Sequence, residues 1–239
     1  MRNYTGCSGF SYDHWMGNFY PDDLPKARRL EFYSQKFDTV EINSSFYHLP
    51  KQKTLENWYE RVPGNFRFTL KGSRYVTHQK KLNNVEEPVN KFYELASVLG
   101  GKLGCILWQL PGNQHKDLEK LDRFCQTLSN EFNNVIEFRH RSWYDEEVYE
   151  VLKNYGVICC LVAAPDHLTT EPVKTADKIY MRFHGKYEWY REWFSDEDLE
   201  DWASKILGLN PAQVYSYFNN DYEGNAPKNA QTFSRLINR

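Results

Sequence analysis

Short apolar runs alternate with amphipathic stretches along most of the chain. Eight runs have the length and the β-branched or aromatic content typical of strands. The predicted strands cover residues 4–8, 39–43, 67–71, 104–109, 134–139, 157–163, 178–184 and 213–219. Between most of them, apolar residues recur at helical spacing. The predicted helices cover residues 89–99, 118–128, 148–155, 195–206 and 225–236, whereas the connection from 163 to 178 shows no helical pattern.

Eight β/α units in 239 residues predict an α/β fold, a (β/α)8 TIM barrel, as one domain over residues 1–239. The helix between the sixth and seventh strands is expected to be weak or missing. A doubly wound open sheet is the competing interpretation. The N-terminal Gly6-x-x-Gly9 lacks a third glycine and no helical pattern follows it, so it does not indicate a dinucleotide cofactor.

Alternation within the strands predicts which side chains point into the barrel. One face of each strand packs on the outer helices and must be apolar, and the other face points to the lumen. In residues 39–43, Val40 and Ile42 form the apolar face, so Glu41 points inward. The same alternation places polar side chains inward near the carboxyl ends of several strands, at the rim where barrel enzymes build their sites. These residues are Glu41, Asn43, Lys71, Gln109, Glu137, Arg139, Arg182 and His184.

Charged side chains inside a barrel must pair with one another or with a ligand, because an unpaired buried ion is costly. The candidate catalytic residues are Glu41, Lys71, Glu137 and His184. Either carboxylate could act as a general base, with the imidazole as the acid. The alternative is a structural ion-pair network, with pairs such as Glu41–Lys71 and Glu137–Arg139.

The loops after the third, fifth and seventh strands interleave basic and aromatic residues. Cations suit the phosphate groups of a ligand, and planar rings suit its bases or sugars. The candidate ligand-binding residues are Asn43, Tyr47, His78, Gln109, Arg139, Trp143, Arg182, Asn219 and Asn220. The segment Asn219-Asn220-Asp221 ends the last strand just before a helix, which favours an anion cradle, although turn chemistry would use the same residues.

Charge and hydropathy limit the classes of partner. The 32 acidic residues slightly exceed the 30 Lys+Arg residues, so a uniformly basic nucleic-acid coat is excluded and only a local basic patch remains. The longest uncharged apolar stretch, 157–164, is far shorter than a membrane helix, and the N-terminus has no apolar signal core. We therefore expect a cytoplasmic protein with an anionic ligand, nucleic acid being one candidate, and no membrane partner.

Cysteine and metal chemistry are weakly indicated. The five cysteines form no Cys-x-x-Cys pair, and we expect buried, reduced thiols. Glu41, Glu137 and His184 could meet as a two-carboxylate, one-imidazole site for a divalent metal. Lys71 and the two arginines would compete with a cation there, and no His-x-His spacing occurs, so support for a metal cofactor is weak.

Several segments together resemble the YecE-like family, an uncharacterised TIM-barrel family. The resemblance is carried by residues 6–12 (GCSGFSY), 40–47 (VEINSSFY), 109–111 (QLP), 137–140 (EFRH), 183–185 (FHG) and 217–220 (YFNN). It spans nearly the whole chain, with Ser45 where the family often has Thr. The resemblance implies a TIM barrel and supplies no reaction.

Three functions follow from these observations. The first is a barrel that binds a phosphate-bearing ligand, nucleic acid or nucleotide, at its C-terminal rim, with phosphodiester hydrolysis as the candidate reaction. The second is a sugar isomerase, epimerase or glycosidase that uses the paired glutamates. The third is a non-catalytic protein-interaction module.

Overall fold

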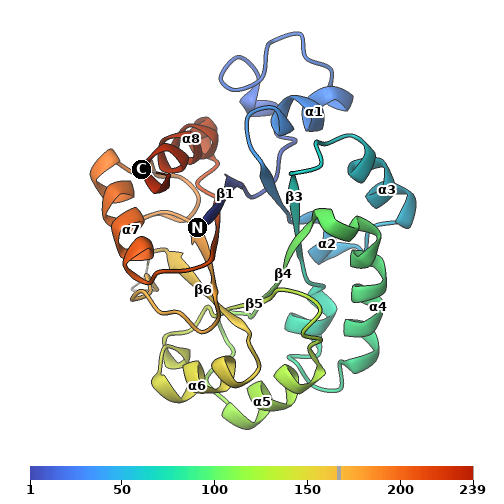
Figure 1. The fold of residues 1–239 in the computed structure, drawn as a ribbon, viewed down its shortest axis with the longest axis vertical. Helices are drawn as coiled ribbons and strands as arrows, with labels where there is room; N and C mark the ends of the chain where they lie inside the picture. Colours follow the sequence, from blue (N-terminus) through green and yellow to red (C-terminus); the bar gives the residue numbers. More distant parts are fainter. Residues whose placement is uncertain (166–167, 239) are drawn as a thin grey trace.

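The computed structural model describes residues 1–165 and 168–238. All eight predicted strands are present in one parallel sheet of order β1-β8-β7-β6-β5-β4-β3-β2. The strands are β1 (Arg2–Cys7), β2 (Thr39–Ile42), β3 (Arg67–Lys71), β4 (Leu103–Gln109), β5 (Asn134–Glu137), β6 (Ile158–Ala163), β7 (Lys178–Phe183) and β8 (Gln213–Phe218). The sheet curls into a barrel with the helices on its outside, as predicted (Figure 1).

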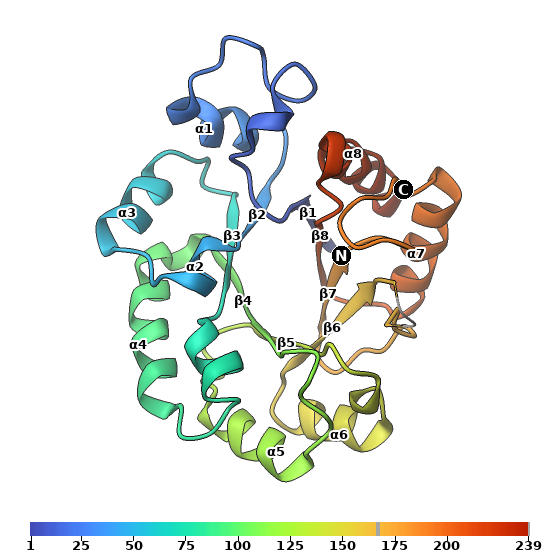
Figure 2. The ribbon, with the colours of Figure 1, turned by 180° about the vertical axis from the view of Figure 1, so that it is seen from behind.

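The helices form an outer ring around this barrel, which is also evident from the opposite side (Figure 2). They are α1 (Arg29–Ser34), α2 (Ser44–Tyr47), α3 (Gln52–Glu60), α4 (Glu86–Ala96), α5 (Leu118–Thr127), α6 (Glu146–Asn154), α7 (Asp196–Gly208) and α8 (Asn225–Ile237). The last five were predicted. The first three were not, because α1 and α2 are short and α3 buries only Leu55. The described part of the β6–β7 connection, residues 164–165 and 168–177, contains no helix, as expected.

The two faces of the strands carry different side chains. The outward faces of β2 and β3 bury Val40, Ile42, Phe68 and Leu70 in the layer beneath the helices. The lumen has its own apolar cluster, which includes Tyr180, Tyr215 and Tyr217. These positions agree with the alternation that predicts Glu41 on the inner face. No helix in the described residues is long and apolar enough to cross a membrane, and all five cysteines are buried free thiols.

The barrel closes between β1 and β2 through an unusual seam. A single parallel bridge joins Ser8 to Glu41, and the Gly9 amide donates to the Glu41 carbonyl at 2.8 Å. Closer to the strand starts, the Tyr33 hydroxyl stands between the strands: it accepts from the Cys7 amide at 2.7 Å and donates to the Thr39 carbonyl at 3.0 Å. The seam therefore depends on one tyrosine hydroxyl as well as on strand pairing.

Gly6 allows this close approach, and its substitution tests the seam. A Cβ at Gly6 would lie 2.1 Å from the Thr39 carbonyl oxygen and 2.7 Å from the Tyr33 hydroxyl. We predict that Gly6→Ala lowers the free energy of unfolding by about 1–3 kcal/mol, as overpacking does. Urea denaturation measures the effect. Gly64→Ala, whose added Cβ meets nothing within 4 Å, is the control and should not lower the midpoint. Equal midpoints for the two variants would contradict the seam.

Candidate functional site

Arg182 joins two strands across the lumen of the barrel. Its side chain extends from β7, with Nη1 2.6 Å from Glu137 Oε2 on β5 and Nη2 2.6 Å from Glu41 Oε1 on β2. The arginine side chain is 1% exposed and both glutamates are fully buried. Burial raises the cost of each charge, so the three groups stabilise one another only as a set.

Glu41 is held by two further donors. The Ser8 hydroxyl donates to its Oε1 at 2.7 Å, and the Tyr180 hydroxyl donates to its Oε2. The expected Glu41–Lys71 ion pair is not formed, because Arg182 occupies the carboxylate instead. Glu41 therefore accepts three hydrogen bonds, all from protein donors.

Glu137 is the most heavily paired carboxylate of the network. Besides Arg182 it accepts from Arg139 Nε, the predicted pair, and its Oε1 lies 3.2 Å from His184 Nε2. Burial alone would raise the pKa of Glu137, but the charges of Arg139 and Arg182 and the hydrogen bond from His184 outweigh it. The pKa of this carboxyl thus lies well below its usual range, and Glu137 is ionised at neutral pH.

His184 is held in its neutral form. Burial and the charges of Arg139 and Arg182 lower the pKa of its imidazole well below the ordinary value, and the attraction of Glu137 only partly opposes them. The ring Nδ1 lies 3.2 Å from Asn219 Nδ2. Arg139 Nη2, which can only donate, lies 3.0 Å from Nε2, so this ring nitrogen faces both the Glu137 carboxylate and a guanidinium. A neutral imidazole is a poor general acid, so the geometry does not favour that predicted role.

A cavity of about 350 Å³ opens beside this network at the carboxyl ends of the strands. Its lining is cationic and rich in amides and phenols. The lining residues are Tyr12, Asn43, Tyr47, Lys71, Arg139, Arg182, Tyr190, Asn219 and Asp221. Two buried polar atoms of these residues, Asn43 Oδ1 and Arg182 Nε, have no hydrogen-bond partner among the described residues. Unpaired buried polar atoms in a cavity wall are available to a bound ligand.

Lys71 is the cation of the cavity without a carboxylate. It ends β3, its Nζ lies 4.4 Å from the centre of the Phe46 ring, and it forms no ion pair with an acid of the described residues. Burial and the nearby charge of Arg182 lower the pKa of Lys71 to about 8, although Glu137 and Glu41 oppose the shift.

Six of the predicted site residues share the cavity wall, and three lie in the network instead. The six are Asn43, Tyr47, Lys71, Arg139, Arg182 and Asn219. Glu41, Glu137 and His184 do not line the cavity and are fully buried, and they contact its wall through Arg139, Arg182 and Asn219.

The side chains of Trp143 and Asn220 are buried against other parts of the protein. The fully buried Trp143 ring stacks on Phe138 with centroids 4.8 Å apart, and its Nε1 donates to the Gln114 carbonyl at 2.6 Å. Asn220 is buried and donates to the Glu192 carbonyl at 2.7 Å. Neither side chain reaches the cavity, because each is committed to holding a loop against the barrel.

Gln109 and His78 also lie outside the cavity wall. Gln109 Nε2 donates to the adjacent Leu110 carbonyl at 2.8 Å. The His78 ring packs edge-on against Phe46, and burial and the charge of Lys71 lower its pKa to about 4. His78 is therefore uncharged at neutral pH and adds no cation to the site.

Sequence reasoning missed three residues of the cavity wall. Tyr12 donates to the Ser8 carbonyl at 2.6 Å. Asp221 accepts from Trp15 Nε1 at 2.6 Å and pairs with His14 at 3.0 Å, and burial raises its pKa. The third residue, Tyr190, follows β7. All three lie in loops without periodicity, so only the strand ends before them pointed to this region.

The described residues contain no group of three or more His, Cys, Asp or Glu side chains that could hold a metal ion. Glu137 and His184 do meet, but Glu41 is turned to Arg182. The guanidinium thus takes the place between the carboxylates that a divalent metal would need.

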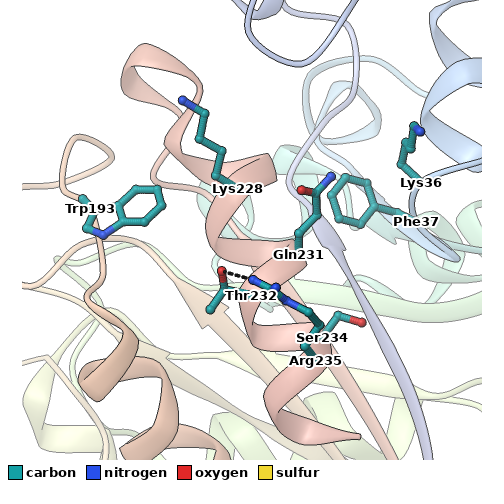
Figure 3. A pocket seen from close by; sticks show the side chains of 8 residues that line it. All are labelled: Lys36, Phe37, Trp193, Lys228, Gln231, Thr232, Ser234 and Arg235. Atoms are coloured by element: carbon teal, nitrogen blue, oxygen red, sulfur yellow. Dashed lines mark hydrogen bonds between the residues drawn. The ribbon is translucent and has the colours of Figure 1, made fainter.

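A second hollow, of about 550 Å³, lies on the outside of the barrel along α8 (Figure 3). Lys36, Lys228 and Arg235 give it positive charge, and Trp193 and Phe37 add rings. Unlike the rim cavity, it contains no buried ion network. Its cations provide matched surface controls for the experiments below.

Acid should weaken the network through Glu137. Because its folded pKa is depressed, its stabilising contribution is fully present above the unfolded value of about 4.3 and is lost as the pH falls. We predict that Glu137→Gln lowers the free energy of unfolding by about 3–5 kcal/mol at pH 7, as removal of one partner from a buried pair does. The difference in the free energy of unfolding between this variant and the unsubstituted protein should shrink toward pH 3.

Denaturant unfolding at several pH values measures this gap. Glu119→Gln, at a side chain that is 88% exposed, is the control and should leave the profile unchanged. A gap for Glu137→Gln that stays constant from pH 7 to pH 3 would contradict the assignment.

Comparison with known proteins agrees with the fold. The family model described as "Protein of unknown function DUF72" matches residues 4–239. The UPF0759 protein YunF of Bacillus subtilis is 27% identical over 98% of this chain and 94% of its own length. The UPF0759 protein YecE of Escherichia coli is 32% identical, over 54% of this chain and 47% of its own length.

Solved structures give the same result. A DUF72 family protein of Thermotoga maritima superposes with a TM-score of 0.91 at 29% identity, covering 100% of both chains. One from Enterococcus faecalis has a TM-score of 0.84 at 21% identity, covering 99% of this chain and 96% of its own. A β-mannanase from Mytilus edulis, at 10% identity and a TM-score of 0.53, shares the fold alone. The match of the family model over nearly the whole length shows that this chain belongs to the DUF72 family.

Proposed function

We propose that this protein binds a small phosphate-bearing ligand, of nucleotide size, in the cavity at the C-terminal rim of the barrel. The observation that carries the proposal is the charge of the cavity wall. Lys71, Arg139 and Arg182 all line it, and Asp221 is the one carboxylate in the lining. Phosphate oxygens are recognised by such clusters of cations and amide donors.

The three cations of the cavity wall equal in number the two buried glutamates and Asp221, but Lys71 is the cation that the network leaves without a carboxylate partner. Arg182 and Arg139 balance Glu41 and Glu137, and His184 is neutral. Lys71 then has no carboxylate of its own in the network. Positive charge held in a partly dry cavity attracts an anion more strongly than charge on an open surface.

The size and the mouth of the cavity favour a nucleotide over a polymer. A volume of about 350 Å³ suits a small ligand. Tyr47 and Tyr190, which are 66% and 42% exposed, line the cavity and offer rings for stacking. Trp143, the other predicted stacking residue, is buried elsewhere.

The contacts favour binding over hydrolysis by the glutamates. Glu41 and Glu137 are each held by protein side chains and do not line the cavity. The same burial away from the cavity weighs against the glycosidase alternative, which needs two carboxyl groups at the scissile bond. A base for phosphodiester cleavage would have to come from another group of the cavity wall.

Isothermal titration calorimetry with adenosine monophosphate tests the proposal. We expect saturable binding that Lys71→Gln weakens at least tenfold, about 1.4 kcal/mol, because a cation without a protein partner is lost. Lys228→Gln, in the outer hollow, is the matched control and should bind as the unsubstituted protein does. Adenosine without phosphate should not bind.

Two further ligands separate the sources of phosphate. Inorganic phosphate should compete with the nucleotide. A single-stranded oligonucleotide should bind no more tightly than the mononucleotide. Much tighter binding of the oligonucleotide, with a steep salt dependence, would mean that the ligand is a nucleic acid and not a nucleotide. If Lys71→Gln binds adenosine monophosphate as tightly as the unsubstituted protein does, the proposed phosphate site is wrong.

A further inference from the structure

Lys71 is placed as a reactive amine and not only as a cation. It is the final residue of β3, whose inner face it shares with Thr69, while Phe68 and Leu70 pack outward. Thr69 is fixed by a 2.8 Å hydrogen bond to Tyr217. The lysine is therefore presented by a rigid strand at the rim, as a group that reacts with a bound ligand needs to be.

The surroundings of Lys71 disfavour its ammonium form. The acids of the network are occupied by arginines. The face of the Phe46 ring, 4.4 Å from Nζ, attracts an ammonium modestly, whereas burial and the charge of Arg182 lower the pKa of Lys71. With the pKa of Lys71 at about 8, roughly a tenth of the amine is unprotonated at pH 7. An ordinary lysine would have far less free amine at that pH.

Lys102, a buried lysine away from the rim, shows what a purely structural role looks like. Lys102 Nζ donates to the Tyr59 carbonyl at 2.6 Å and to the Val62 carbonyl at 2.7 Å, so its donors are used by the protein. It does not line the rim cavity. Lys71 does line it, and has no such acceptors among the described residues. A desolvated amine beside other cations is the arrangement that activates lysine as a nucleophile.

We propose that Lys71 forms an imine with an aldehyde or ketone group of the phosphate-bearing ligand. The inference rests on the proposed function and specifies its ligand class as a carbonyl compound that carries phosphate. The unprotonated Nζ attacks the carbonyl carbon, the C–N bond forms, and an amine proton moves to the oxygen. The second amine proton and the hydroxyl then leave as water, which gives the neutral imine without an oxidant or reductant.

The remaining cations have a consistent part in this scheme. Arg139 and Arg182 are positioning residues that hold the phosphate, and Asn219 and Asn43 add amide groups to the same wall. Arg139 is itself kept in place by Glu137 and by the Trp189 ring, 4.6 Å away. The phosphate would thus be anchored while the carbonyl end reaches Lys71.

Borohydride trapping tests the imine. The protein is incubated with pyridoxal 5′-phosphate, an aldehyde that carries phosphate, then reduced with borohydride, digested and examined by mass spectrometry. We expect at least tenfold more adduct on Lys71 than on Lys228 of the outer hollow, with protection by inorganic phosphate. The labelling rate should rise between pH 7 and pH 9.

Lys71→Arg separates the amine from the charge. This variant should still bind adenosine monophosphate, because the cation remains, but should lose the adduct at this position. An adduct on Lys71 no greater than that on Lys228 would overturn the imine while leaving the phosphate site intact. Equal labelling of Lys71 by pyridoxal and by pyridoxal 5′-phosphate, without protection by phosphate, would keep the reactive amine and overturn the phosphate site.

Discussion

The contact of one guanidinium with two carboxylates across the lumen determines the rest of the site. Arg182 reaches from β7 to Glu41 on β2 and Glu137 on β5, so three strands that are far apart in the sequence are joined inside the barrel. Each of these charges would be costly alone, because all three side chains are buried. Together they fix the distances between strand ends, and Glu41 also lies at the β1–β2 seam through Ser8 and Gly9.

This arrangement also explains why the rim is cationic although the whole chain is slightly acidic. The carboxylates of Glu41 and Glu137 face inward. They accept hydrogen bonds from Arg182, Arg139, Ser8 and Tyr180. The cavity wall is left with the outer parts of the arginines and with Lys71, which has no acid of its own. A single network thus stabilises the barrel and sets the charge of the neighbouring cavity.

Strand alternation predicted the barrel and the inward charges, because one face of each strand must be apolar to pack on the helices. It placed Lys71, Arg139 and Arg182 at one rim, and the structure brings them together. It could not choose the partners of Glu41, since Lys71 and Arg182 were both inward and only their distances differ. The structure does not bring Trp143 and Asn220 to the cavity wall, whereas Tyr12, Tyr190 and Asp221 line it without having been candidate binding residues. A loop residue carries no periodic signal that separates packing from ligand contact.

Crystallisation of the protein in tungstate, with anomalous diffraction, tests the central claim most directly, since the heavy oxyanion reports where a phosphate group would be held. We predict an anomalous peak in the rim cavity, with oxygens about 3 Å from Lys71 Nζ and the Arg139 guanidinium. Arg182 should remain between Glu41 and Glu137. An empty rim cavity, with tungstate only beside Lys36, Lys228 and Arg235 in the outer hollow, would contradict it.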